Sequence, residues 1–101
     1  MSDEITEELF YIYILSNEKN TILYVGFTKN LKRRVLQHKS KSSKGFTSQY
    51  KCTKLVYFES TIYVLNAIKR EKQIKKWNRE WKENLINDMN PDWNDLYWMI
   101  S

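Results

Sequence analysis

The stretch that decides the fold is residues 10–15, which read FYIYIL. An unbroken run of β-branched and aromatic side chains is typical of a strand buried on both faces of a sheet. Residues 16–20 follow with the composition of a turn, and residues 21–27 read as a second strand. The two runs therefore predict an antiparallel hairpin, on which the other elements are expected to pack.

Downstream of the hairpin, helical and strand patterns alternate. Asn30 is a good N-cap, so we expect a helix over residues 30–40. A basic loop at residues 39–53 leads to a third strand at 54–59. An amphipathic helix follows at 61–77, and a second helical stretch continues to Met89, where Asn90-Pro91-Asp92 ends it. An aromatic tail or short final helix occupies residues 93–98.

The element order ββαβαα predicts an α+β fold: a small three-stranded antiparallel sheet flanked by helices in a sandwich-like arrangement. With 101 residues, the chain is long enough for one modest core. We expect the acidic residues 1–8 to form a loosely ordered lead-in and residues 9–98 to form a single domain. No apolar run approaches the roughly 20 residues of a membrane span. Cys52 is the only cysteine, which favours a reducing, cytoplasmic setting.

The charge of the chain points to a polyanionic partner. The formal net charge is +5, and residues 28–51 contain eight Lys or Arg but no Asp or Glu. Solvated surfaces usually mix both signs, so a long stretch of one sign favours nucleic acid over simple solubility. We expect contacts to the phosphate backbone from a set of basic residues: Lys32, Arg33, Lys39, Lys41, Lys44 and Lys51.

Two predicted helices carry ionisable residues on their apolar sides. Glu71 lies near the centre of the inward face of the 61–77 helix, where an unpaired carboxylate costs several kcal/mol. Arg34 and His38, four residues apart, lie on the inward stripe of the 30–40 helix. From its own helix alone, Glu71 is about as easily explained by an ion pair with a cation from another element. Three ionisable groups directed at one interior favour a functional site.

Two tyrosines are expected beside this site. Pairing of the first two strands places Tyr13 next to Tyr24, and both are expected to point toward the face that the two helices cover. Cross-strand tyrosine pairs are also common packing. Gly26, at the end of the second strand, fits a position where a neighbouring group approaches the backbone closely.

The residues described so far resemble the GIY-YIG endonuclease family. Tyr11-Ile12-Tyr13 and Tyr24-Val25-Gly26 match the two sequence blocks that name the family, and Arg34, His38 and Glu71 follow in the family's order. The chain is most similar to small stand-alone members related to the excinuclease N-terminal nuclease domain. Their second half carries blocks that are present here at residues 70–77 and 90–93. One departure is Tyr11, which replaces the glycine of the first block.

This resemblance implies metal-dependent hydrolysis of DNA. Glu71 would hold a single divalent cation, Mg²⁺ or an ion such as Mn²⁺, and Arg34 would stabilise charge on the phosphoryl group. Tyr13 or Tyr24 would orient or deprotonate the attacking water, and the sequence leaves open which one does so. His38 would hydrogen-bond a tyrosine and relay its proton. Asn90 matches, more weakly, an asparagine that helps to hold the site or the substrate.

Two alternatives are compatible with the same residues. In the first, the chain is a nucleic-acid-binding module with little activity. In the second, it is a nuclease subunit that needs a targeting protein partner. DNA versus RNA, the preferred substrate structure, the oligomeric state and the biological pathway all stay open at this point.

Overall fold

The computed structural model describes residues 8–40, 45 and 49–100. Within them the chain forms one sheet of three strands and a set of helices, so the predicted α+β class and the order ββαβαα are confirmed. The elements are β1 (Phe10–Ser16), β2 (Leu23–Thr28), α1 (Leu31–Lys39), β3 (Lys54–Thr61), α3 (Val64–Lys76), α4 (Arg79–Met89) and the short 3-10 helix η1 (Leu96–Met99). No helix of this described part is long and apolar enough to cross a membrane.

The sheet has the strand order β2-β1-β3, and both pairings are antiparallel. Strand β1 is therefore central, and residues from Ile12 to Ser16 are buried along it. This position explains why its sequence is apolar on both faces instead of alternating. Strand β2 lies at one edge of the sheet, so only one of its sides is paired with another strand.

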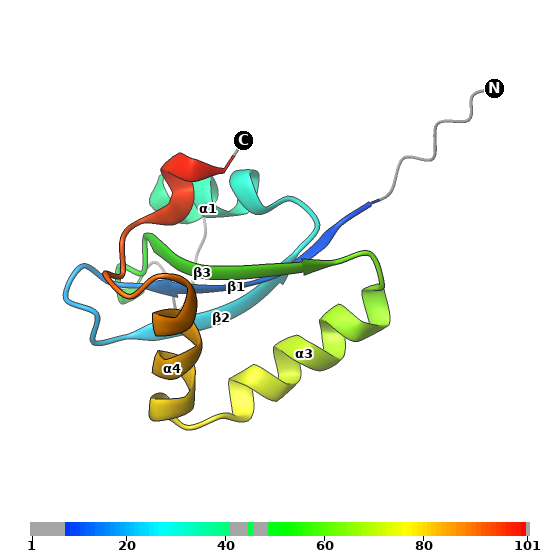
Figure 1. Cartoon of the computed structure of the whole chain (residues 1–101). Helices are drawn as coiled ribbons and strands as arrows, with labels where there is room; N and C mark the ends of the chain where they lie inside the picture. Colours follow the sequence, from blue (N-terminus) through cyan, green and yellow to red (C-terminus); the bar gives the residue numbers. More distant parts are fainter. Residues whose placement is uncertain (1–7, 41–44, 46–48, 101) are drawn as a thin grey trace.

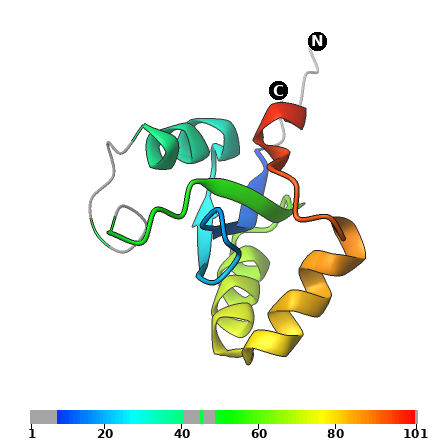
Figure 2. The same cartoon turned by 90° about the vertical axis from the view of Figure 1, so that its left-hand side faces the viewer.

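The helices are divided between the two faces of the sheet (Figures 1 and 2). Ile12 and Ile14 point to the face covered by α3 and α4, where Ala67, Ile74 and Ile86 complete a core. Tyr13 and Leu15 point to the opposite face, which α1 and η1 cover. The expectation that the helices carrying Arg34 and Glu71 cover one face together with the phenols is therefore wrong. Side chains alternate along a strand, and the chain uses both faces.

Gly26 makes room for the ring of Tyr13. The two residues are register partners across β1 and β2. A Cβ atom added to Gly26 would lie 2.3 Å from Cζ and 2.4 Å from the hydroxyl oxygen of Tyr13. The phenol end of Tyr13 thus lies directly on the backbone of the edge strand. Any side chain at position 26 would displace it, so the reason for this glycine is close approach.

The boundaries of the helices differ from the predicted ones by a few residues. Helix α1 begins after Asn30, whose side chain accepts a hydrogen bond from the backbone of Arg33, as an N-cap does. Helix α3 begins at Val64 because β3 extends to Thr61. Asn78 lies just beyond α3. It is exposed and caps α4 by accepting a hydrogen bond from the backbone of Trp81.

Two residues that were expected to bind nucleic acid hold the C-terminal segment in place. Asn90 is buried, and its amide nitrogen donates to the backbone oxygens of Val56 (3.0 Å) and Asn94 (2.8 Å). Lys39 donates to the backbone oxygen of Thr53 at 2.8 Å and forms an ion pair with Asp95. These contacts occupy both side chains within the protein, and a contact of either residue with nucleic acid stays a prediction.

We predict that Gly26→Ala destabilises the protein by about 1 to 3 kcal/mol, because overpacking a core costs that much. Tyr13→Leu removes the ring that the added methyl group would strike. The double variant should therefore lose less stability than the sum of the two single variants, with a coupling of about 1 kcal/mol. Chemical denaturation of the four proteins measures this. Strict additivity would contradict the contact.

We also predict that Asn90→Ala lowers the free energy of unfolding by about 2 kcal/mol, because it leaves buried backbone groups without their partner. Asn84→Ala is the matched control, since Asn84 lies on α4 and is less buried than Asn90. It should change stability by no more than about 0.5 kcal/mol. Equal effects of the two substitutions in urea denaturation would show that the bonds of Asn90 contribute nothing specific.

Candidate functional site

Helix α1 places Arg34 at the edge of its buried stripe. Leu31, Val35 and His38 are buried against the sheet. Arg34 itself is exposed and so lies beside this stripe. The expectation that Arg34 lies on the inward stripe is therefore wrong. The turn that leads into α1 is fixed by Thr28, whose hydroxyl accepts from the backbone nitrogen of Asn30 (3.1 Å) and donates to its backbone oxygen (3.3 Å).

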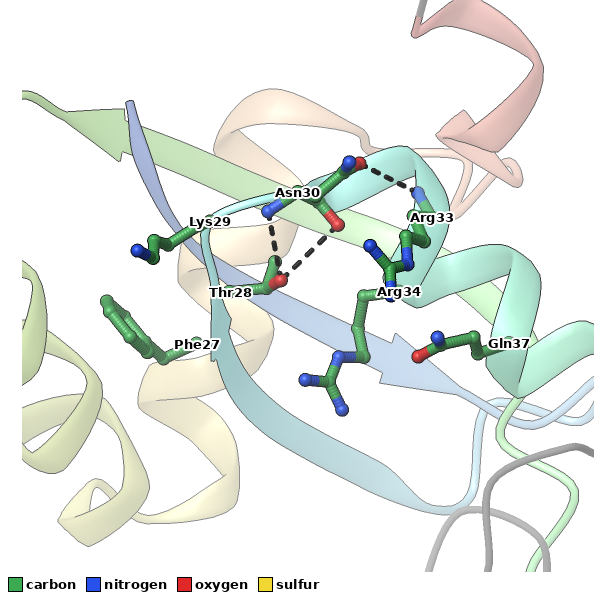
Figure 3. A pocket seen from close by; sticks show the side chains of 7 residues that line it. All are labelled: Phe27, Thr28, Lys29, Asn30, Arg33, Arg34 and Gln37. Atoms are coloured by element: carbon green, nitrogen blue, oxygen red, sulfur yellow. Dashed lines mark hydrogen bonds between the residues drawn. The ribbon is translucent and has the colours of Figure 1, made fainter. Parts of the chain in front are cut away.

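A basic cavity of about 360 Å³ lies at this junction of β2 and α1, and we call it the junction cavity (Figure 3). Its lining contains three cationic side chains, and none of the seven described residues around it is acidic. Figure 3 shows Arg34 and Gln37 extending from α1 along β2, with Phe27 and Lys29 on the other side of the strand. The lining residues are Phe27, Thr28, Lys29, Asn30, Arg33, Arg34 and Gln37.

Two phenols and an imidazole form an aromatic cluster under α1. The ring centroids are 6.4 Å apart for Tyr13 and Tyr24, 6.2 Å for Tyr13 and His38, and 6.0 Å for Tyr24 and His38. The Tyr13 hydroxyl and His38 Nε2 form a hydrogen bond at 3.4 Å, whose donor depends on the imidazole tautomer. The structure thus brings the predicted tyrosines and the histidine together.

The surroundings keep both hydrogen-bonded partners uncharged. Burial, and next the proximity of Tyr24, raises the pKa of Tyr13 well above the ordinary value of about 10. The Arg34 guanidinium lowers the pKa of Tyr13, while the Glu71 carboxylate raises it further. Burial also lowers the pKa of His38 below about 6.5, and the Arg34 charge adds to this effect. At neutral pH the cluster is a neutral phenol beside a neutral imidazole.

Glu71 lies on α3, which covers the opposite face of the sheet. It lies on the stripe of α3 that buries Ala67 and Ile74, and its side chain is 15 % exposed. Its carboxylate pairs with Lys75 at 2.6 Å, a cation of the same helix that is 49 % exposed. The charges of Glu71 and Arg34 both act on the hydroxyl of Tyr13. Both ionisable groups therefore lie near enough to Tyr13 for their charges to influence its pKa.

Glu71 stays the predicted ligand of a metal ion. No group of three or more His, Cys, Asp or Glu residues that could hold a metal occurs in the described ranges 8–40, 45 and 49–100. Mg²⁺ retains several waters and is commonly bound through one or two carboxylates. The donor set therefore fits a single hydrated cation and does not fit a zinc-type site.

The expected nucleic-acid-binding residues are spread over several regions. Lys32, Arg33 and Lys51 are exposed. Lys41 and Lys44 lie outside the described residues, as does the acidic lead-in except for Glu8. The sequence did not predict that Phe27, Thr28 and Gln37 line the junction cavity. A Ser or Thr two residues before a helix N-cap is the signal that indicates such a turn.

We predict that His38 makes the protein less stable in mild acid. Its pKa is lower in the folded state, so the unfolded state takes up the proton first as the pH falls below about 6.5. Stability is then full above that pH and is lost as the pH falls toward the folded-state pKa. In His38→Gln, the urea concentration at the midpoint of unfolding should depend less on pH between about pH 7 and 5. An unchanged pH dependence in this variant would contradict the assignment.

The chain is similar to known proteins of one domain family. A family model described as the GIY-YIG catalytic domain matches residues 9–84. A UPF0213 protein of Syntrophus aciditrophicus is 39 % identical over 83 residues, which cover 81 % of this chain and 93 % of that protein. The UPF0213 protein NP_0776A of Natronomonas pharaonis is 36 % identical over 78 residues, covering 77 % and 91 %.

Among solved structures, the UPF0213 protein BH0048 of Bacillus halodurans aligns with a TM-score of 0.56 at 24 % identity. The alignment covers 86 % of this chain and 92 % of that one, and it shows a shared fold. The match over residues 9–84 and the identities above establish the relationship by themselves. This chain belongs to the GIY-YIG domain family, among the small proteins that carry the name UPF0213.

Proposed function

We propose that this protein hydrolyses phosphodiester bonds in DNA with the help of a single divalent cation, Mg²⁺ or an ion such as Mn²⁺. The observation that carries the proposal is that Arg34 and Glu71, on helices that cover opposite faces of the sheet, both lie near enough to Tyr13 for their charges to influence its pKa. Hydrolysis at a scissile phosphate is helped by three groups placed around it: a cation, a guanidinium that binds anions and a phenol. The family membership supports the same chemistry.

Glu71 is the residue that would hold the cation. Its carboxylate is mostly buried, and its partner Lys75 is a flexible, half-exposed side chain that a divalent ion can displace. The bound cation would supply Lewis-acid stabilisation of charge on the phosphate and the leaving oxygen.

Arg34 would bind the phosphate oxygens. Its guanidinium is exposed and lines a cavity whose described walls carry no acid. A planar guanidinium fits two oxygens of a phosphate at once, which a lysine ammonium does not. Arg34 would therefore both position the phosphate and offset the charge that develops on it.

The two phenols would have different tasks. Tyr13 is fully buried, with its hydroxyl on Gly26 and near His38, and the raised pKa of Tyr13 keeps its proton in place. We assign Tyr13 to orienting neighbouring groups as a neutral hydrogen-bond partner. Tyr24 is only partly buried, and we assign this residue to orienting the attacking water. His38, a neutral imidazole in contact with both rings, would accept the released proton.

The surface around the site supports a nucleic-acid substrate recognised through its backbone. Lys32, Arg33 and Lys51 are exposed and remain in the proposed binding set, with Lys41 and Lys44 of the undescribed segment. Backbone contacts of this kind carry no base sequence information by themselves. The single reduced cysteine, Cys52, is buried and fits a cytoplasmic setting for this activity.

We predict that Glu71→Gln lowers the rate of plasmid nicking in Mg²⁺ by about 100-fold or more, because a metal ion stabilises the transition state by several kcal/mol. Glu83→Gln is the matched control. Glu83 also pairs with a cation on its own helix, Arg79, at 2.7 Å, but it lies on α4. The nicking rate of the Glu83→Gln variant should equal that of the wild type.

The same assay separates the alternatives. Wild-type protein that binds DNA without nicking it would support a binding module, and activity that appears only with cell extract would support a subunit with a targeting partner. Equal nicking by the wild type and Glu71→Gln would remove Glu71 from the mechanism.

A further inference from the structure

A second pocket adjoins the junction cavity. Its volume is about 310 Å³, and it shares Lys29 and Asn30 with the first. The two cavities therefore adjoin at the turn from β2 into α1, and we refer to them together as the groove. This second part, which we call the Tyr11 pocket, is lined by aromatic, apolar and basic side chains: Tyr11, Lys29, Asn30, Leu31, Lys32, Phe58, Met99 and Ile100.

Two aromatic rings form one wall of the Tyr11 pocket. Tyr11 on β1 and Phe58 on β3 have ring centroids 6.5 Å apart with an interplanar angle of 59°. Both side chains are only partly buried, so each ring keeps an accessible part. Tyr11 pairs in register with Thr28, the residue that fixes the turn at the junction. The aromatic wall is thus placed next to the junction cavity by the sheet itself.

Tyr11 is also the position where this chain departs from the sequence block that names its family. A glycine there would leave no ring beside Phe58, and the Tyr11 pocket would lose part of its wall. The mechanism proposed above gives Tyr11 no task, because the phenols at the phosphate are Tyr13 and Tyr24. The substitution therefore adds a surface feature that the chemistry of bond cleavage does not require.

The charge of the groove suits a polyanion along its whole length. Lys29 lies where the two cavities meet, and Lys32 is exposed on α1 at the Tyr11 pocket. None of the described lining residues of either cavity is acidic. One acid lies nearby: Glu8 approaches Lys29 at 3.5 Å, and the side chains are 64 % and 62 % exposed, respectively. An exposed pair of this kind is weak and yields to a phosphate.

We propose that this groove binds unpaired nucleotides next to the cleaved phosphate, with a base stacked on the Tyr11–Phe58 wall and the backbone held by Lys29 and Lys32. Aromatic rings interleaved with cations are the surface that single strands bind, because every base has a face to stack. A base inside an intact duplex is already stacked on its neighbours and cannot reach such a wall. The inference rests on the proposed function and specifies its substrate: DNA with a single-stranded or splayed flank.

Binding measured without cleavage tests the inference. Fluorescence anisotropy in EDTA would compare a labelled oligothymidylate with a blunt duplex of equal length. Tyr11→Leu keeps an apolar side chain but removes the ring, so we expect the single strand to bind about fivefold to tenfold more weakly. Tyr11→Phe keeps the ring and should bind as the wild type does. Tyr63→Leu is the control, since Tyr63 is an exposed tyrosine outside both cavities.

Substitution of an exposed lysine on α1 gives a second test of the groove, which changes no residue of the sheet. Lys32→Ala should reduce the dependence of log K on log salt by about 0.7 for the single strand, the value for one lost phosphate contact. Lys19→Ala is the control, because Lys19 is exposed in the β1–β2 turn at the other end of β1. It should leave the salt dependence unchanged.

The outcomes separate this inference from the proposed function. Wild-type affinity in Tyr11→Leu, or equal loss in Tyr11→Leu and Tyr11→Phe, would overturn the stacking wall even if the protein nicks DNA. Tighter binding of the duplex than of the single strand would overturn it as well. Binding that follows the expected order in a protein without nicking activity would retain the groove and reject the nuclease.

Discussion

The contact on which the site depends is that of the Tyr13 ring with the backbone of Gly26. Tyr13 comes from the central strand, and its hydroxyl lies on the edge strand because residue 26 has no side chain. Residues on opposite faces of a sheet are normally separated by its backbone and side chains. At this edge, the phenol instead experiences the charge of Arg34 from α1 and of Glu71 from α3. The glycine thus allows a phenol whose pKa responds to charges on both helices to lie against the edge strand.

Neutral and charged groups occupy different parts of the site. The interior of the cluster holds a phenol and an imidazole that stay neutral, since burial shifts the pKa of each toward its uncharged form. The charges lie at the periphery: a guanidinium exposed to the junction cavity and a carboxylate whose partner is a half-exposed lysine. The guanidinium is therefore open to a charged ligand, whereas a ligand of the mostly buried carboxylate would have to displace Lys75.

Much of the fold follows from local patterns, whereas the site follows only in part. The run at residues 10–15 predicts a strand buried on both faces, and the structure makes it central. Asn30 predicts the start of α1. Periodicity also identifies Glu71 and His38 as inward residues, but it does not say which face of the sheet each helix covers. That choice depends on packing over the whole chain. For the same reason, the structural tasks of Asn90 and Lys39 were not predictable, because their partners are distant in sequence.

The most direct test of this account is a magnesium titration followed by NMR, with labelled tyrosine and histidine side chains. We expect the ring signals of Tyr13 and His38 and the amide of Gly26 to shift with one common affinity, although Glu71 lies on the other face. The shifts should vanish in Glu71→Gln and persist in Glu83→Gln. Shifts confined to α3, or shifts at Tyr13 that survive the loss of the Glu71 carboxylate, would contradict the account.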